Sequence, residues 1–338
     1  MYFRDSLQKI KRISNLSIDK TEREIKKICY RLILAIVVLY TTPNLHAAGD
    51  LKIAGARQIG MGMSSICMVN VYSSYNNQAA GAYLERPSFG LYYAPVFIGQ
   101  GVSNLTGIFA MPVKKGGTIG VSVNYFGYSL YNEKKVGLSY ALKLAKWMSI
   151  GVQLDYLNTK ISGYGSKNYV TFEMGLFSKP IDELSIAFHV YNPLKIYIDR
   201  ATGEKVPTLF RLGITYEAIK KFFISAQIEK DLVNKLIFRA GAEYTLKDIV
   251  SFRAGVATDP VTGTIGIGVL LKQGVSFDAA FSYQGNLGFQ PHFGITYTIK
   301  KKKIIPDDKG LQVPESSIET KPVQAIKSPE KKVRRTIR

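Results

Sequence analysis

Residues 118–125 read TIGVSVNY and residues 292–299 read HFGITYTI, and apolar side chains occupy every second position in both stretches. Residues 264–271, TIGIGVLL, repeat this pattern. A period of two places successive side chains on opposite faces of a β-strand. The sequence therefore predicts strands that have one apolar face and one smaller, more polar face.

Fourteen such segments follow one another between Ser88 and Ile299. They begin near Ser88, Asn104, Thr118, Lys134, Met148, Asn168, Leu184, Thr208, Phe222, Leu236, Val250, Thr264, Val275 and Pro291. An even number of antiparallel strands is what single-chain bacterial barrels require. We therefore expect an all-β fold, a fourteen-stranded antiparallel transmembrane β-barrel over residues 88–299.

The connections between these segments alternate in length. Those after even-numbered strands, such as 143–147 and 272–274, have at most six residues, whereas the odd-numbered 192–207 has sixteen. Short periplasmic turns and longer outer loops are typical of outer-membrane barrels. This asymmetry predicts a protein of the bacterial outer membrane, in contact with its lipid, with both termini in the periplasm.

The smaller face of the strands carries charges of both signs, while the apolar face carries almost none. The charged positions on the smaller face are Asp155, Glu173, Arg211, Glu229, Arg239, Glu243, Arg253 and Asp278. A soluble β-sandwich would turn its polar face outward. Because an export signal is also present, we expect these charges inside a barrel, where they would form ion pairs.

The export signal lies near the N-terminus. Residues 32–40, LILAIVVLY, follow a basic stretch that ends at Arg31 and precede the small residues Ala47 and Ala48. This is the order of a secretory signal, and nine apolar residues are too few for a transmembrane helix of about twenty. We assign residues 1–47 to a signal peptide; a short internal core helix is the alternative.

Residues 48–87 do not alternate and are rich in small side chains. They are too small and polar to fold alone, yet they can fill the lumen of a barrel from the periplasmic side. We expect a plug in which Arg57 pairs with a luminal carboxylate. The alternative is a disordered leader, against which its apolar residues argue.

Two parts of this region carry a resemblance to a known family. GARQIGMG at 55–62 and YNNQAAGAYLERPSFGLYY at 75–93 resemble the opening of FadL-like outer-membrane barrels, most closely the PorV/PorQ-type branch associated with type IX secretion. The resemblance implies a fourteen-stranded barrel with an N-terminal plug. The positions that match the family motif are Gly55, Arg57, Met61, Gly62, Asn77 and Ala79. Gln78 stands where the family has proline.

Residues 300–338 contain twelve basic and five acidic residues and no aromatic residue. This composition predicts a disordered basic tail in the periplasm, either a solvated end or a tether for an acidic partner. Much of the net charge of +20 lies at the two ends of the chain. A nucleic-acid-binding protein would place it on the folded body, so we expect no nucleic-acid partner.

The sequence shows no pattern of catalytic or metal-binding residues. The three histidines, His46, His189 and His292, are far apart, and the spacing of residues shows no metal site, phosphate loop or serine–histidine pair. Cys29 falls in the signal, which leaves Cys67 without an internal disulfide partner. We therefore expect no cofactor, no metal and no enzymatic activity.

The resemblance implies an accessory or docking component of type IX-like protein secretion. Its partners would be secretion or cell-envelope proteins, which it would bind through short outer loops and the basic tail. The alternative is a FadL-like transporter of long-chain fatty acids or other hydrophobic small molecules. A general porin is a third reading, against which the plug argues.

Overall fold

The computed structural model describes residues 51–96, 101–113, 117–199, 203–232, 236–285 and 287–299. The expected signal peptide and the expected tail lie outside these residues. Among the described residues, no helix is long and apolar enough to cross a membrane.

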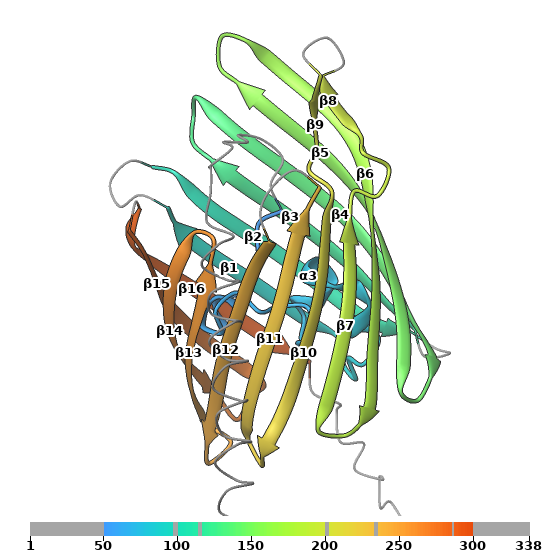
Figure 1. The fold of residues 1–338 in the computed structure, drawn as a ribbon, viewed down its shortest axis with the longest axis vertical. Coiled ribbons are helices and arrows are strands. Elements are labelled where there is room, and N and C mark those ends of the chain that lie inside the picture. Colours follow the sequence, from blue (N-terminus) through green and yellow to red (C-terminus); the bar gives the residue numbers. More distant parts are fainter. Residues whose placement is uncertain are drawn as a thin grey trace, which may run out of the picture. The chain divides into compact units, whose positions relative to one another are not determined.

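Fourteen antiparallel strands close into one barrel (Figure 1). They are β1 (Ser88–Pro95), β2 (Ser103–Val113), β3 (Gly117–Gly127), β4 (Tyr131–Ala145), β5 (Met148–Ile161), β6 (Gly165–Ile181), β7 (Leu184–Tyr191), β10 (Leu209–Ile219), β11 (Phe222–Asp231), β12 (Leu236–Leu246), β13 (Val250–Thr258), β14 (Val261–Leu270), β15 (Val275–Gln284) and β16 (Gly288–Thr298). Each strand pairs with its neighbours in sequence, and β1 closes the barrel on β16. The predicted fold is confirmed.

The connections differ between the two rims of the barrel. Short turns at 146–147, 182–183 and 220–221 lie on the rim where β1 begins and β16 ends. On the opposite, long-loop rim, residues 192–208 contain a small hairpin of β8 (Tyr197–Asp199) and β9 (Glu204–Lys205). The sequence analysis missed this hairpin, because strands of two or three residues are too short to establish a period.

The alternation along the strands separates the two faces of the wall. On β1, Phe89, Leu91 and Tyr93 are exposed on the outside, while Tyr92 and Ala94 are buried on the inside. The same order of apolar outside and polar inside holds along β5, where Gln153 and Asp155 are buried. An apolar outer wall suits lipid and excludes the alternative of a soluble sandwich.

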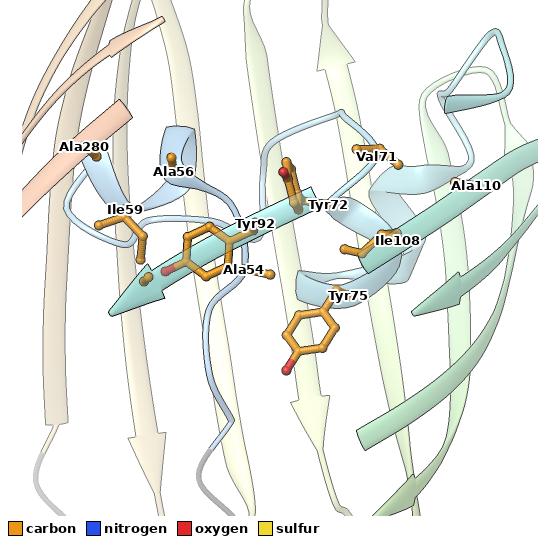
Figure 2. Close-up of a cluster of buried hydrophobic side chains, with 11 residues drawn as sticks. Ala54, Ala56, Ile59, Val71, Tyr72, Tyr75, Tyr92, Ile108, Ala110 and Ala280 are labelled. Carbon is orange, nitrogen blue, oxygen red and sulfur yellow. The ribbon is translucent and has the colours of Figure 1, made fainter. Parts of the chain in front are cut away.

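Residues 51–87 fill the middle of the barrel, where Figure 1 shows them in blue between the strands. They form three short helices, α2 (Ala56–Gly60), α3 (Ser73–Asn76) and α4 (Gln78–Gly81). Their apolar side chains, among them Ile59 and Tyr72, pack against Tyr92 and Ile108 of the wall (Figure 2). This segment is a luminal plug, and the reading of 51–87 as a disordered leader was wrong.

The plug contacts the wall where the strands carry glycine on their inner face. A Cβ at Gly255 would lie 2.1 Å from the backbone nitrogen of Gly62, and one at Gly241 would lie 2.3 Å from the carbonyl oxygen of Met61. On the opposite side, a Cβ at Gly151 would lie 2.4 Å from the backbone nitrogen of Ala79. The plug backbone therefore rests directly on the wall backbone, which no larger residue would permit.

The plug runs through the barrel from the long-loop side to the short-turn rim. Lys52 lies with its ammonium 4.3 Å from the ring centroid of Phe126, near the long-loop end of β3. At the other end, the hydroxyl of Tyr83 donates to the carbonyl of Lys146 in a short turn (3.1 Å). The segment was expected to enter the lumen from the periplasmic side, but its first described residues lie on the long-loop side, and only its end, before Ser88, lies at the short-turn rim. The placement of both termini in the periplasm concerns residues outside those described.

Candidate functional site

A cluster of buried charges lies inside the wall between β4 and β10. Lys135 forms ion pairs with Glu173 and, at 3.4 Å, with Asp155. Arg211 donates to Nδ1 of His189 (2.8 Å), which leaves the Nε2–H of His189 to donate to Glu173 (2.9 Å). All five side chains are buried. Charges removed from water are costly unless they are paired, so this cluster ties neighbouring strands together.

The plug is hydrogen-bonded into the same cluster. Gln78 donates from Nε2 to Glu173 (2.8 Å), and Arg211 donates to the carbonyl of Asn76 (2.7 Å). The ammonium of Lys135 lies 4.6 Å from the ring centroid of Tyr75. A proline at position 78, as in the family that the sequence resembles, has no side-chain donor. The departure at Gln78 therefore adds a bond between plug and wall.

A second chain of charges ties the start of the plug to the opposite wall. Arg57 on α2 forms two hydrogen bonds with Glu243, at 2.6 and 2.8 Å. Arg253 bonds to the same carboxylate at 2.5 Å and to Asp278 at 2.7 Å. The structure thus gives Arg57 a luminal carboxylate as its partner. Four charges from α2, β12, β13 and β15 alternate in sign, so each has an oppositely charged neighbour.

The other motif residues shape the plug. Gly55 precedes α2 with φ 106°, and Gly62 has φ 65°, a region that favours glycine. Asn77 accepts from the backbone nitrogen of Ala79 (3.2 Å) and donates to the carbonyl of Ile66 (2.9 Å). Met61 and Ala79 are buried. Apart from Arg57, which forms an ion pair, the motif residues shape the backbone turns of the plug and allow its close contacts with the barrel wall.

Sequence reasoning missed Lys135, which is the central cation of the first cluster. Lys135 lies on the same, inward side of β4 as the small residues Gly137, Ser139 and Ala141, because all four occupy alternate positions along the strand. This alternation could have identified Lys135 as an inward-facing residue. Because Lys134 is also a lysine, the sequence alone did not show which of the two faces inward.

A vestibule lies above the plug on the long-loop side, with a volume of about 430 Å³. Its apolar lining comes from the plug (Ile53, Ile59, Met63) and from the wall, including Tyr92 and Phe126. The polar lining residues are Lys52, Asn104, Glu229, Asp231, Arg239, Asp259, Thr262, Gln284, Gln290 and His292. The vestibule is therefore only partly apolar, and its volume falls in the range of sites that bind small molecules.

A serine–histidine pair lies near the floor of the vestibule. His292 is 2.9 Å from the hydroxyl of Ser282 through Nε2 and 2.9 Å from that of Tyr92 through Nδ1. Ser282 is buried and does not line the vestibule. These bonds therefore hold β1, β15 and β16 together and present no nucleophile. Among the described residues, no group of acidic, histidine or cysteine side chains could hold a metal ion.

Cys67 offers a test of how the plug is seated. Its thiol is buried against β10, and burial raises the pKa of Cys67 to about 12. Since the thiolate is the reactive form, we expect no maleimide labelling of Cys67 at about pH 8 in the folded barrel and full labelling after unfolding. A Cys29→Ser background removes the other thiol. Rapid labelling of the folded barrel would contradict a seated plug.

Comparison with solved structures finds barrels of the same fold. The toluene transporter TbuX of Ralstonia pickettii has a TM-score of 0.59 at 11% identity, over 75% of this chain and 100% of that one. A FadL homologue of Pseudomonas aeruginosa has a TM-score of 0.55 at 14% identity, over 75% and 100%. The toluene transporter TodX of Pseudomonas putida has a TM-score of 0.52 at 12% identity, over 74% and 98%. No protein-family model and no curated protein matches the sequence.

These comparisons correct the functional expectation drawn from the sequence. The solved structures of the same fold are described as channels and transporters of hydrophobic compounds, so the assignment to type IX-like protein secretion was wrong. The comparisons support the FadL-like part of the resemblance and add nothing for its PorV/PorQ-type branch. At these identities the likeness is one of fold: the chain is a fourteen-stranded barrel with the architecture of FadL-like outer-membrane barrels.

Proposed function

We propose that this protein is a non-enzymatic channel of the bacterial outer membrane that takes up hydrophobic small molecules from outside the cell. The observation that carries the proposal is the partly apolar vestibule on the long-loop side of a luminal plug. The fold shared with hydrophobic-compound channels supports it. The plug fills the lumen below the vestibule, which argues against a general porin.

Backbone pairing of the barrel wall is incomplete beside the vestibule, where a side-chain bond from Gln290 to the carbonyl of Val96 (3.4 Å) crosses between β1 and β16. Pairing between β1 and β16 ends at Tyr93 and Phe293. Two positions further, the same register places Pro95 opposite Pro291, and proline has no N–H to donate. Pro95 also lines the vestibule. This seam is where we expect a hydrophobic molecule to pass most readily between vestibule and membrane.

Filling the vestibule with a larger side chain should weaken ligand binding. We expect Ala257→Trp, on the inner face of β13, to weaken binding of an uncharged naphthylamine dye at least about tenfold, because the indole would occupy the cavity. Dye fluorescence measures this with the full chain in phosphatidylcholine nanodiscs, after subtraction of empty nanodiscs.

The matched control is Ala254→Trp on the outer face of the same strand, which lines an apolar groove of about 640 Å³ on the lipid side. It should leave dye binding unchanged. If Ala254→Trp weakens binding and Ala257→Trp does not, the dye occupies the outer groove and the vestibule is not the site. Absence of any saturable binding to the unaltered barrel would refute the proposed function.

A further inference from the structure

The outward face of β3 to β6 changes from apolar to polar between two neighbouring rows of residues. Strand pairing aligns an apolar row of Val123, Val136, Tyr156 and Val170. Two residues closer to the long-loop rim, it aligns a polar row of Tyr125, Lys134, Asn158 and Asn168. Aromatic side chains mark the edge of the apolar band of a membrane barrel, where lipid headgroups begin. The polar row therefore lies at headgroup level.

Two lysines lie close together in this polar band. Lys134 is paired with Asn158, and Lys160 follows Asn158 by two residues on the same outward face of β5. Diagonal neighbours of this kind are about 7–8 Å apart, which is within reach of long side chains. Both lysines are exposed, and neither forms an ion pair with a described residue. Their two ammonium groups can therefore contact one anion.

No acidic residue shares the outward face of β4, β5 and β6, all of whose residues are described. The acidic residues of β4 and β5 face the lumen. Glu133 accepts a hydrogen bond from the hydroxyl of Tyr131, and Asp155 pairs with the buried Lys135. The charges of Lys134 and Lys160 are therefore not offset on their own side of these strands.

Neutral polar side chains lie beside the two lysines. Asn158 donates from its side-chain nitrogen to the side-chain oxygen of Asn168 (2.6 Å), so the side-chain nitrogen of Asn168 remains available as a donor. The hydroxyl of Ser166, which is paired with Lys160, lies 3.3 Å from the side-chain nitrogen of Asn158. Phosphate oxygens accept hydrogen bonds from ammonium, amide and hydroxyl groups. The polar band thus offers the kinds of donor that bind a phosphate group.

The two lysines favour a phosphate monoester over a phosphate diester. A monoester carries a charge of about −1.5 to −2 at about pH 7, whereas a diester carries one negative charge. A monoester can therefore neutralise both ammonium groups at once. Because the polar band continues the lipid-facing wall, acyl chains attached to the phosphate would lie against the apolar row below it.

We propose that Lys134 and Lys160 bind the phosphate monoester headgroup of a membrane lipid, in the leaflet at the long-loop rim. Asn168 and Ser166 donate further hydrogen bonds to the phosphate, and the acyl chains lie over Tyr156 and Val170. This inference concerns the outer surface of the barrel. It is independent of the vestibule and of what the channel carries.

Native mass spectrometry tests the proposal with the full chain in a neutral detergent that contains equal amounts of phosphatidic acid, a monoester, and phosphatidylglycerol, a diester. At about pH 8 we expect the barrel to retain at least about fivefold more phosphatidic acid, since one further contact between a basic residue and lipid charge corresponds to about fivefold in affinity. Lys134→Gln with Lys160→Gln should lower this ratio several-fold. Lys134→Arg with Lys160→Arg should keep it, because both charges remain.

The matched control is Lys146→Gln with Lys220→Gln, which removes two exposed lysines at the short-turn rim and should leave the ratio unchanged. The basic tail is present in every variant, so its contacts with lipid do not affect the comparison. At about pH 5 the monoester loses most of its second charge, and the ratio of the unaltered barrel should fall.

Three outcomes would overturn the proposed lipid site. The first is an unchanged ratio after Lys134→Gln with Lys160→Gln, or an equal fall in the control. The second is a ratio that persists at about pH 5, which would mean that the second phosphate charge is not recognised. The third is displacement of phosphatidic acid by an excess of inorganic phosphate, which would make free phosphate the occupant. Dye binding in the vestibule should be the same in all these variants, so either proposal can fail without the other.

Discussion

A Gly62→Ala barrel is expected to conduct ions where the unaltered barrel is closed. A Cβ at residue 62 would lie 2.2 Å from the carbonyl oxygen of Ala240 and 2.7 Å from the backbone nitrogen of Val256. Both are backbone atoms of the wall and cannot move aside as a side chain would. Alanine also costs about 1–2 kcal/mol at φ 65°, and overpacking adds about 1–3 kcal/mol.

Both costs disappear if the plug leaves its seat, so the variant should favour an unplugged barrel. Conductance in planar bilayers measures this directly. Gly263→Ala is the matched control, because a Cβ at that position of β14 meets no atom within 4 Å. A closed, fully folded Gly62→Ala barrel would show that the contact between plug and wall is looser than the structure indicates.

Replacement of Lys135 by methionine is expected to cost about 3–5 kcal/mol of the free energy of unfolding. The substitution leaves Asp155 and Glu173 buried beside each other without the cation that neutralises them. It also removes the ammonium from between the rings of Tyr75 and Tyr191, at 4.6 and 5.2 Å from their centroids. Urea unfolding of the barrel in lipid vesicles, followed by tryptophan fluorescence, measures the loss.

Lys221→Met is the control for this prediction. Lys221 pairs with Asp248 at 2.7 Å, but Asp248 is exposed and Lys221 is only partly buried, so the loss should be at most about 1 kcal/mol. Adding Asp155→Asn to Lys135→Met should restore most of the stability, because the buried charges that remain, Glu173 and Arg211, are opposite in sign and are linked through His189. Equal effects of the two lysine substitutions would mean that water reaches the buried cluster.

The strands could be predicted because each depends on a local property of the chain. The start of every barrel strand lies within three residues of its predicted position, from Ser88 to Gly288. Lipid on one side and a polar lumen on the other force a period of two along each strand. Turn lengths then indicated the two rims, since a hairpin turn needs few residues and an outer loop does not.

The contacts between plug and wall could not be predicted in the same way. Arg57 and Glu243 are 186 residues apart in sequence, and no local pattern selects Glu243 among the luminal carboxylates. The inward direction of Lys135 was hidden by Lys134. The function inferred from the plug motif was wrong, because its residues shape backbone turns that barrels with different functions can share.

By itself, the sequence determined a fourteen-stranded barrel, its apolar outside, its charged inside and a segment that fills it. These follow from side-chain alternation and from composition, which act over a few residues. The tertiary structure alone decided which charges pair, where the glycines of the wall contact the plug, and that a partly apolar vestibule remains on its long-loop side. Barrel closure sets these features, because it brings residues from distant strands to fixed distances across one lumen.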